Sequence, residues 1–584
     1  MNKLDANGRY EHGEKKLLAA FHHSDVNGFL AKRLQQAASQ LRVSQRSPLI
    51  LFPLIFASCW SGEASRASAD AQVFPILQNA TVGVTGQRKT FGLDRPVDTL
   101  RTQLLKQDTQ VTLTMIEALD VAAENNRDFQ RQKEQLYLAA LNLTREQHNF
   151  SVIFSGSGAG EIVDVVDNNN VHDDSVLLAN DLRAQVTTIA GTRIVASFAN
   201  AFLRSIIHGG QFDGSSIFNL TLTQPLLFGA GPSIVREPLT QSERDVIYAV
   251  RTFERFRSTF AVRVISDYYR LLGQIANLQN VEANYQTLRQ SSEQIDELYR
   301  AGRKTITDLG RAKQSEYSAD AQRVTTKNRL QTSLDAFKLQ LGLPVTAKVD
   351  LDINELTRLN EQRVEAITVN ESTALELARE RRYDYRTTVD EVEDAGRRIL
   401  VAENALEMAL DFTSALNLPA ETGKGLNLDW SRVNWSAGFE LNLALDKLVE
   451  RNSYRSSLIS FDVAVRTREQ SEDQIALEVR TALRDIQASF DGYKIQTEAV
   501  RLAQQRVEAT TDLYAAGRVQ ALDKIDAQDA LISAQLDLTA ASVDYSVSRL
   551  QLMNQLECLA LEPKGLRFDP ALPIPQPKPV EQKS

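Results

Sequence analysis

Hydrophobic and polar residues along this 584-residue chain follow two different periods, of which the longer one predicts helices. In two regions, apolar side chains recur at steps of four, three, four and three residues. The two sets are Val264, Tyr268, Leu271, Ile275 and Leu278, and Val479, Leu483, Ile486, Phe490 and Tyr493. Such steps place all the apolar side chains of a set on one helix face, with the seven-residue period of a coiled coil.

The two helical regions are copies of one unit. Leu298, Tyr299, Ala301, Gly302 and Arg303 return 215 positions later as Leu513, Tyr514, Ala516, Gly517 and Arg518. The same shift carries Asp308 to Asp523 and Leu341 to Leu556 without an insertion. Solenoid repeats have periods of roughly 20 to 50 residues, so a repeat this long indicates an ancestral duplication.

The shorter period, of two residues, predicts strands. Apolar residues alternate with polar or small ones from 432 to 446, from 406 to 417 and from 218 to 223, and Phe150, Val152 and Phe154 mark another strand. In a soluble sheet the apolar face would pack on a core. In an outer-membrane barrel it would meet lipid, and the polar face would line water. Each half is thus predicted to run helix, strand pair, long helical hairpin.

The strand region of the first half is predicted to be longer than that of the second. The helix before the strands, at 112–149, repeats at 373–405 with a shift of 256, so that Ala118 matches Ala374. The helices after the strands repeat with the smaller shift. Residues 233–302 could form one helix of roughly 100 Å, long enough to cross much of a periplasm.

Composition and charge narrow the function. The chain is 43% hydrophobic and 24% charged, with 15 prolines, as expected for a folded, mostly helical protein. A net charge of −9 argues against nucleic acid as the main partner. Six histidines and two cysteines leave little for metal chemistry, and no nucleotide motif is present. We therefore expect no cofactor and no enzymatic activity.

Cys59, the first of the two cysteines in the chain, follows a stretch with the features of a secretory signal. An apolar stretch at 48–58, preceded by Arg42 and Arg46, has the charged region and core of such a signal. It is too short to span a bilayer, which takes about 20 apolar residues. The segment Phe56-Ala57-Ser58-Cys59 resembles a lipoprotein box, in which Cys59 would be lipidated. The alternative is an ordinary signal cleaved between Ala57 and Ala69. This signal favours the interpretation of the strands as membrane strands. The other cysteine, Cys558, is expected to be a buried small residue.

The order of these elements resembles the TolC-type outer membrane efflux family over residues 112–561. The motifs are Thr223-Gln224-Pro225-Leu226, Phe228-Gly229, Tyr514-Ala515-Ala516-Gly517 with Asp523 and Asp526-Ala527, and Asn554-Gln555-Leu556. The resemblance implies a homotrimer without an active site. Each protomer would give four strands to a twelve-stranded barrel in the outer membrane, continued by an α-barrel of antiparallel helical hairpins in the periplasm. The sequence pattern alone predicts about four membrane strands per chain. Because the smallest single-chain bacterial barrels have eight strands, several copies would have to assemble to close a barrel.

The resemblance divides the chain into six parts. These are 1–58, an N-terminal extension and signal peptide; 59–111, a lipid-anchored linker; 112–342, the first repeat; 343–372, an equatorial linker; 373–561, the second repeat; and 562–584, a proline-rich tail.

The resemblance also implies sites at the hairpin tips. Gly302, Arg303, Gly517 and Arg518 would contact a periplasmic adaptor, and glycine suits a helix reversal that needs positive φ. Thr307, Asp308 and Tyr514 would belong to a hydrogen-bonded gate. Asp523 and Asp526 would form carboxylate rings that favour cations. Aspartates near helix starts are also commonly caps. Val519 stands where the best-known family member has an arginine that latches the closed gate. Either the neighbouring Arg518 serves as the latch, or the gate has no such latch.

The resulting prediction is a passive exit duct for small solutes. An inner-membrane pump would drive it through the adaptor, and outer-membrane lipid would surround its strands. One alternative is the exit duct of a type I polypeptide secretion system. Another is a non-conducting coiled-coil envelope lipoprotein, against which the strand alternation argues.

Overall fold

The structure is a computed structural model that describes residues 61–88, 91–93, 99–106, 110–166, 172–205, 213–361, 366–367, 369–420, 428–516, 518–562 and 565–568. The chain divides into two compact units, Met1–Asp70 and Ala71–Ser584. Only the start of helix α3 (Gly62–Thr85) is described in the first unit. The following paragraphs concern the second unit. Cys59 lies outside the described residues.

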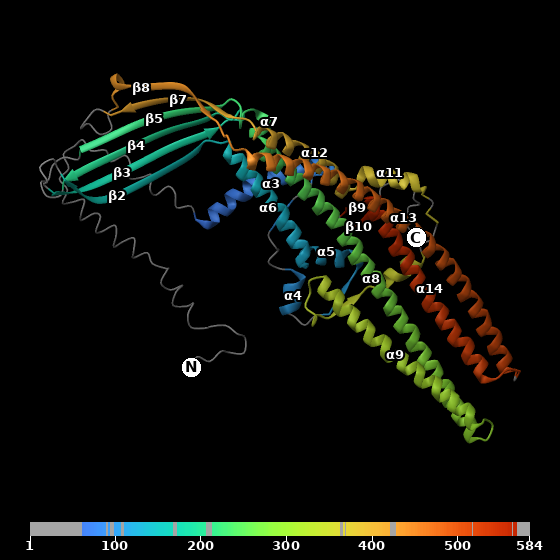
Figure 1. The fold of residues 1–584 in the computed structure, drawn as a ribbon. Coiled ribbons are helices and arrows are strands. Elements are labelled where there is room, and N and C mark those ends of the chain that lie inside the picture. The colour runs from blue at the N-terminus through green and yellow to red at the C-terminus, as the bar shows by residue number, and fades with distance from the viewer. Residues whose placement is uncertain are drawn as a thin grey trace, which may run out of the picture. The chain divides into compact units, whose positions relative to one another are not determined.

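Two long helical hairpins follow from the heptad pattern (Figure 1). In the first, α8 (Glu237–Arg300, 64 residues) is followed by α9 (Ile306–Gln340, 35 residues). In the second, α13 (Leu448–Ala515, 68 residues) is followed by α14 (Ala521–Gln555, 35 residues). At 1.5 Å per residue, α8 and α13 are each roughly 100 Å long. The prediction of long continuous helices is confirmed.

The duplication is visible in the core. One apolar cluster joins α5 (Met115–Asn125) to the first hairpin, and a second joins α11 (Glu371–Arg381) to the second hairpin. Val264, Tyr268 and Leu271 are buried in the first cluster, and Val479 and Ile486 in the second. The alanines of the shorter helices match as well. Ala118 and Ala122 in one cluster, and Ala374 and Ala378 in the other, are fully buried.

One antiparallel sheet of six strands holds the predicted strands of both halves (Figure 1). Its order is β2 (Ile153–Val166), β3 (His172–Thr187), β4 (Arg193–Ser205), β5 (Asp213–Pro225), β7 (Ala409–Pro419), β8 (Asn434–Asn442). The prediction of four strands per chain is therefore wrong, because the first half contributes four strands and not two. The repeat shifts of 256 residues before the strands and 215 residues after them correctly indicated a longer strand region in the first half. They did not indicate the extra hairpin inside it.

The missed strands have a weak contrast between their two faces. On β4, the face with Ser197 also carries Val195, Ala199 and Leu203. Alternating alanines and mixed faces do not produce the period of two that marks β5 and β8. At the other end, β8 stops at Asn442, shorter than the predicted 15-residue strand, because its pairing with β7 ends at Ala409. Leu445 beyond it is 94% exposed.

The corner between β8 and α13 is held by its own polar side chains. The Lys447 ammonium donates to the Leu406 carbonyl, and the Leu448 N–H donates to Asp446 Oδ1 at 3.1 Å.

The remaining elements cap and connect these parts. They are α4 (Leu100–Lys106), β1 (Val111–Leu113), α6 (Arg127–Asn149), α7 (Pro232–Val235), β6 (Val349–Leu351), α10 (Asn354–Glu361), α12 (Tyr383–Asn404), η1 (Trp430–Arg432), β9 (Leu559–Glu562) and β10 (Gly565–Phe568). The segment predicted as a linker at 59–111 contains α3, whose Val73 and Leu77 pack against α6 and α8. The predicted tail at 562–584 begins with a strand, because β10 pairs with β9.

Candidate functional site

The tip of the first hairpin is a tight reversal at a glycine. After α8, Gly302 has φ +71°, a conformation that residues with a Cβ rarely adopt. The Arg303 N–H donates to the Leu298 carbonyl at 2.8 Å. The second tip repeats this bond, since the Arg518 N–H donates to the Leu513 carbonyl at 2.9 Å. Gly517 itself lies outside the described residues.

Asp308 and Asp523 cap the helices that follow the two tips. Asp308 Oδ2 accepts hydrogen bonds from the Thr305 hydroxyl at 2.7 Å and the Thr305 N–H at 3.1 Å. These bonds, and the nearby Lys304 and Arg311, lower the pKa of Asp308. Asp523 Oδ2 likewise accepts from the Gln520 N–H at 2.8 Å. Within one chain, both carboxylates thus complete capping boxes.

A small hollow of about 260 Å³ joins the two tips. From the first hairpin it is lined by Arg303, Lys304, Asp308 and Arg311, and from α14 by Gln520 and Ile525, among others. Ile525 packs with Leu288 and Ala319, which holds α14 against the first hairpin. Among the described residues, none of the three cations has an ion-pair partner. The hollow is therefore a cationic recess.

The other predicted gate residues lie close by on the second hairpin. The Lys524 ammonium is 5.7 Å from the centre of the Tyr514 ring, a cation–π contact between α14 and the end of α13. Thr307, Asp526 and Arg518 are exposed, and Val519 is half-buried. Arg518 forms no ion pair with any residue that the structure describes. The predicted residues thus share one end of the hairpins.

One further carboxylate at this end was not predicted. Asp529 follows Asp523 and Asp526 at three-residue intervals, which places the three side chains on neighbouring positions of one face of α14. Burial raises the pKa of Asp529, and the charge of Asp526 raises it further. The three-residue spacing was the sequence signal that would have found it.

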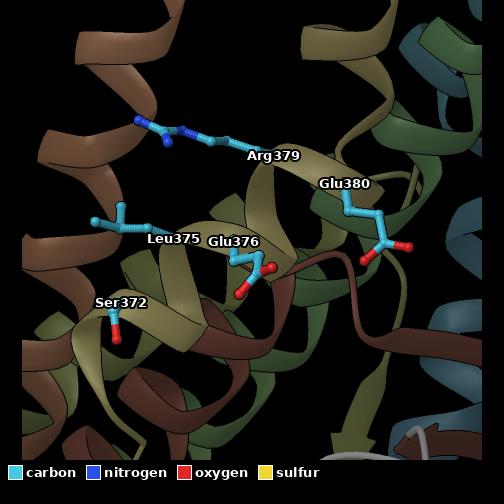
Figure 2. Close-up of a pocket in the computed structure, with 5 residues that line it drawn as sticks. All are labelled: Ser372, Leu375, Glu376, Arg379 and Glu380. Carbon is cyan, nitrogen blue, oxygen red and sulfur yellow. The ribbon is translucent and has the colours of Figure 1, made fainter.

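A second hollow, of about 690 Å³, lies along α11 (Figure 2). Figure 2 shows Leu375 and Arg379 pointing toward one side of α11, and Arg379 forms an ion pair with Glu472 of α13 at 2.6 Å. Part of the α11 surface is thus in contact with α13. In the described ranges of the chain, no group of three or more His, Cys, Asp or Glu side chains could hold a metal ion.

A buried charged network at the junction of α8 and α12 was also not predicted. Asp394, whose side chain is 2% exposed, binds Arg244 at 2.7 Å and Arg397 at 2.9 Å, and accepts from the Tyr248 hydroxyl at 2.7 Å. Burial raises the pKa of Asp394. The hydrogen bonds and the two guanidinium groups outweigh burial and leave this pKa lowered.

None of the helices that the structure describes is long and apolar enough to cross a membrane.

Comparison with known proteins gives one family. A family model described as outer membrane efflux protein matches residues 185–343 and 374–556. Outer membrane protein TolC of Escherichia coli (strain K12) is 20% identical over 323 residues, which cover 53% of this chain and 63% of that protein. The TolC of Vibrio cholerae serotype O1 is 22% identical over 339 residues, covering 55% and 73%. The alignment thus spans less than two thirds of the E. coli protein.

Solved structures share the fold. The outer membrane channel CmeC of Campylobacter jejuni has a TM-score of 0.56 and 15% identity, and covers 76% of this chain and 85% of that one. The outer membrane protein VceC of Vibrio cholerae has a TM-score of 0.54 and 15% identity, and covers 76% and 95%. The predicted fold class, long helical hairpins with a smaller sheet, is confirmed.

Proposed function

Because this chain belongs to the outer membrane efflux protein family, we propose that it is the trimeric outer-membrane channel of a tripartite efflux system. It is a passive exit duct for small solutes, and an inner-membrane pump drives export through a periplasmic adaptor. Family membership itself places the chain in the bacterial outer membrane.

The observation that carries this proposal is the distribution of side chains on the six-stranded sheet. Large apolar side chains stand exposed on one face, among them Phe154 at 79%, Trp435 at 75% and Phe439 at 72%. A soluble protein rarely leaves such a surface to water. The other face carries small and polar residues around a hollow of about 620 Å³. An apolar outside and a polar, concave inside are what a membrane barrel requires.

The helical hairpins supply the periplasmic part of the duct. Their tips present Asp523 and Asp526 as exposed carboxylates on α14. In a trimer six of these carboxylates gather at one end, and such a ring attracts cations and repels anions. The proposed gate also includes Thr307, Asp308 and Tyr514, with Asp529 added as a neighbour of the ring.

The same tips are the proposed contact with the adaptor, through Gly302, Arg303, Gly517 and Arg518. Arg303 lines the cationic recess together with Lys304 and Arg311. This recess favours an acidic side chain on the partner. The energy for transport comes from the pump.

The test is the single-channel conductance of the detergent-extracted oligomer in a planar bilayer. We compare the wild type with the double variant Asp523→Ala, Asp526→Ala. The expected result is small, cation-selective steps in the wild type, and steps that are larger or less selective in the variant. Asp537→Ala is the control, since Asp537 is also exposed on α14 but lies three turns further from the tip.

Two outcomes would count against the proposal. An intact oligomer without conductance in either protein would favour the alternative of an envelope tether. Conductance with equal selectivity in all three proteins would support the channel but contradict the placement of these carboxylates at its constriction.

A further inference from the structure

The strand hairpin formed by β2 and β3 stands outside the part of the chain that matches the family. The match begins at residue 185, close to the end of β3, and resumes at residue 374. It therefore includes β4, β5, β7 and β8 in full and omits β2. The matched part of the chain thus contains four complete strands of the sheet, and β2 with most of β3 extends this sheet on its β4 side.

This hairpin is paired into the sheet along its whole length. β3 runs beside β4 from Ser175 opposite Ser205 to Thr187 opposite Arg193, without a bulge. β2 pairs with β3 in the same continuous way. Because β5 holds the other side of β4, β4 has no free edge. The open edges of the sheet are β2 and β8 (Figure 1).

The hairpin also shares the two faces of the other strands. The register places Phe154, Leu178 and Leu182 on the face that carries Phe218 and Phe439. The opposite face of β3 carries Asp181, Arg183 and Gln185, in line with the polar face of β5. The exposed fractions are 79% for Phe154, 40% for Leu178 and 41% for Leu182, so the apolar face of the hairpin is uncovered.

One polar row crosses this apolar face and is shielded within it. Ser216 donates to Asn200 Oδ1 at 2.7 Å, and these side chains are only 5% and 3% exposed. Asn180 lies next to Asn200 and leans over Gly158, where an added Cβ would be 3.1 Å from its Oδ1. The Ser216–Asn200 bond satisfies the hydroxyl and Asn200 Oδ1 within this face, while Asn200 Nδ2 has no hydrogen-bond partner among the described residues.

From this geometry we infer that β2 of one copy pairs with β8 of the next, and that the hairpin forms part of the barrel wall. The inference rests on the proposed function, in which three copies assemble in the outer membrane. A sheet edge cannot stay unpaired in lipid, since its N–H and C=O groups have no water to bind. Three copies of six strands each give a barrel of 18 strands.

An 18-stranded wall changes what the membrane part of the duct can pass. Barrel diameter grows roughly in proportion to strand number, so this barrel is about 1.5 times as wide as a twelve-stranded one. Barrels of 16 to 18 strands leave an open aqueous channel. The helical tips, and not the barrel, then set the size limit for solutes.

Cysteine cross-linking in outer-membrane fragments tests the edge pairing. In a Cys558→Ser background, Ser436→Cys on β8 is combined in turn with Ser155→Cys, Ser157→Cys or Ala159→Cys on β2. All four positions lie on the concave face, and three positions on β2 allow for the unknown register. The matched control combines Ser436→Cys with Ser197→Cys on β4. The background without added cysteines must give no cross-link.

The expected result is dimers and trimers on denaturing gels with at least one β2 cysteine, and none with Ser197→Cys. Cross-links through Ser197→Cys alone would overturn the inference, because β4 would then meet β8 in a twelve-stranded trimer, while the proposed channel would stand. A protein that gives no inter-chain link and sediments as a monomer in detergent would overturn both the inference and the proposed function.

Discussion

Gly342 and Glu557 occupy equivalent positions in the two halves of the chain, 215 residues apart, and both have left-handed backbone, with φ of +73° and +51°. Each residue ends a long helix in the same way. The N–H of the following residue, Leu343 or Cys558, donates back to Lys338 or Met553 at 2.8 and 2.9 Å. The duplicated helix ends therefore kept their geometry while their residues diverged.

The divergence has a physical reason at each site. A Cβ on Gly342 would lie 2.9 Å from the Asn126 nitrogen and closer still to the Asn125 carbonyl, so only glycine fits. At Glu557 a side chain is tolerated, and its carboxylate pairs with Arg255 of α8 at 2.9 Å. A left-handed non-glycine residue costs roughly 1–2 kcal/mol. The Arg255–Glu557 pair only partly compensates the burial of the carboxylate, whose pKa is raised. The pair ties the first half of the chain to the end of the second.

Replacement of Gly342 by alanine should prevent normal folding. The added Cβ meets backbone atoms, which cannot move aside as a flexible side chain can. We expect strongly reduced amounts of trimer in the outer membrane, measured by quantitative blotting of membrane fractions. The matched control is Gly302→Ala, where φ is +71° but nothing lies within 4 Å of a Cβ. This variant should cost only about 1–2 kcal/mol. Equal losses in both variants would contradict this explanation.

Replacement of Glu557 by glutamine should change how stability depends on pH. Burial raises the pKa of Glu557 from 4.5 to about 7, against the opposing charge of Arg255. Between these two values the folded state binds more protons than the unfolded state, so this residue makes stability fall as pH rises. Glutamine does not titrate and removes the effect.

The measurement for Glu557 is the melting temperature of the purified protein from pH 4.5 to 7.5. Relative to the Gln variant, the wild type should lose stability over this interval, by an amount on the order of 3 kcal/mol. Curves that stay parallel for the two proteins would show that Glu557 has an ordinary pKa.

The two carboxylates that bind Arg244 should differ sharply in their contribution to stability. Arg244 lies 2.7 Å from both Asp394 and Glu393, but their side chains are 2% and 64% exposed. Asp394→Asn leaves two guanidinium groups without their buried partner and should cost about 3–5 kcal/mol. Glu393→Gln should cost less than about 1 kcal/mol. Denaturant unfolding followed by circular dichroism measures both, and similar values for the two variants would refute the role of burial.

The carboxylates of α14 should make ion selectivity depend on pH. Partial burial raises the pKa of Asp529, and the charge of Asp526 raises it further, so Asp529 is expected to lose its charge at a higher pH than an ordinary aspartate. Asp526→Asn removes one repulsive charge and should lower the pKa of Asp529. The pH at which remaining cation selectivity is half lost should then move downward in bilayer recordings. Asp537→Asn should leave this pH unchanged, and a shift in that control would point to a general effect of charge.

The sequence by itself determined the parts of the fold that arise from local, periodic patterns. The heptads around Val264 and Val479 specified the long helices because one apolar face must be buried along their length. The echo of Gly302 located the hairpin tips, since a reversal between helices needs a residue that accepts positive φ. The alternation around Phe439 specified a sheet with one apolar face. These are properties of short segments, so they can be read without knowing what each segment contacts.

Only the tertiary structure decided what depends on contacts between distant segments. β4 became a strand through pairing with β5, and β3 through pairing with β2 and β4, although their mixed faces give little periodic signal. Asp394 became a buried ion-pair partner because α12 packs on α8. Glu557 acquired its raised pKa because packing buries its carboxylate and brings Asp384 of α12 near it, against the opposing charge of Arg255. Asp308 and Asp523 complete capping boxes, whose geometry the carboxylates alone did not specify. Burial and electrostatic environment are set by neighbours that are far away in sequence, which is why the residues alone could not supply them.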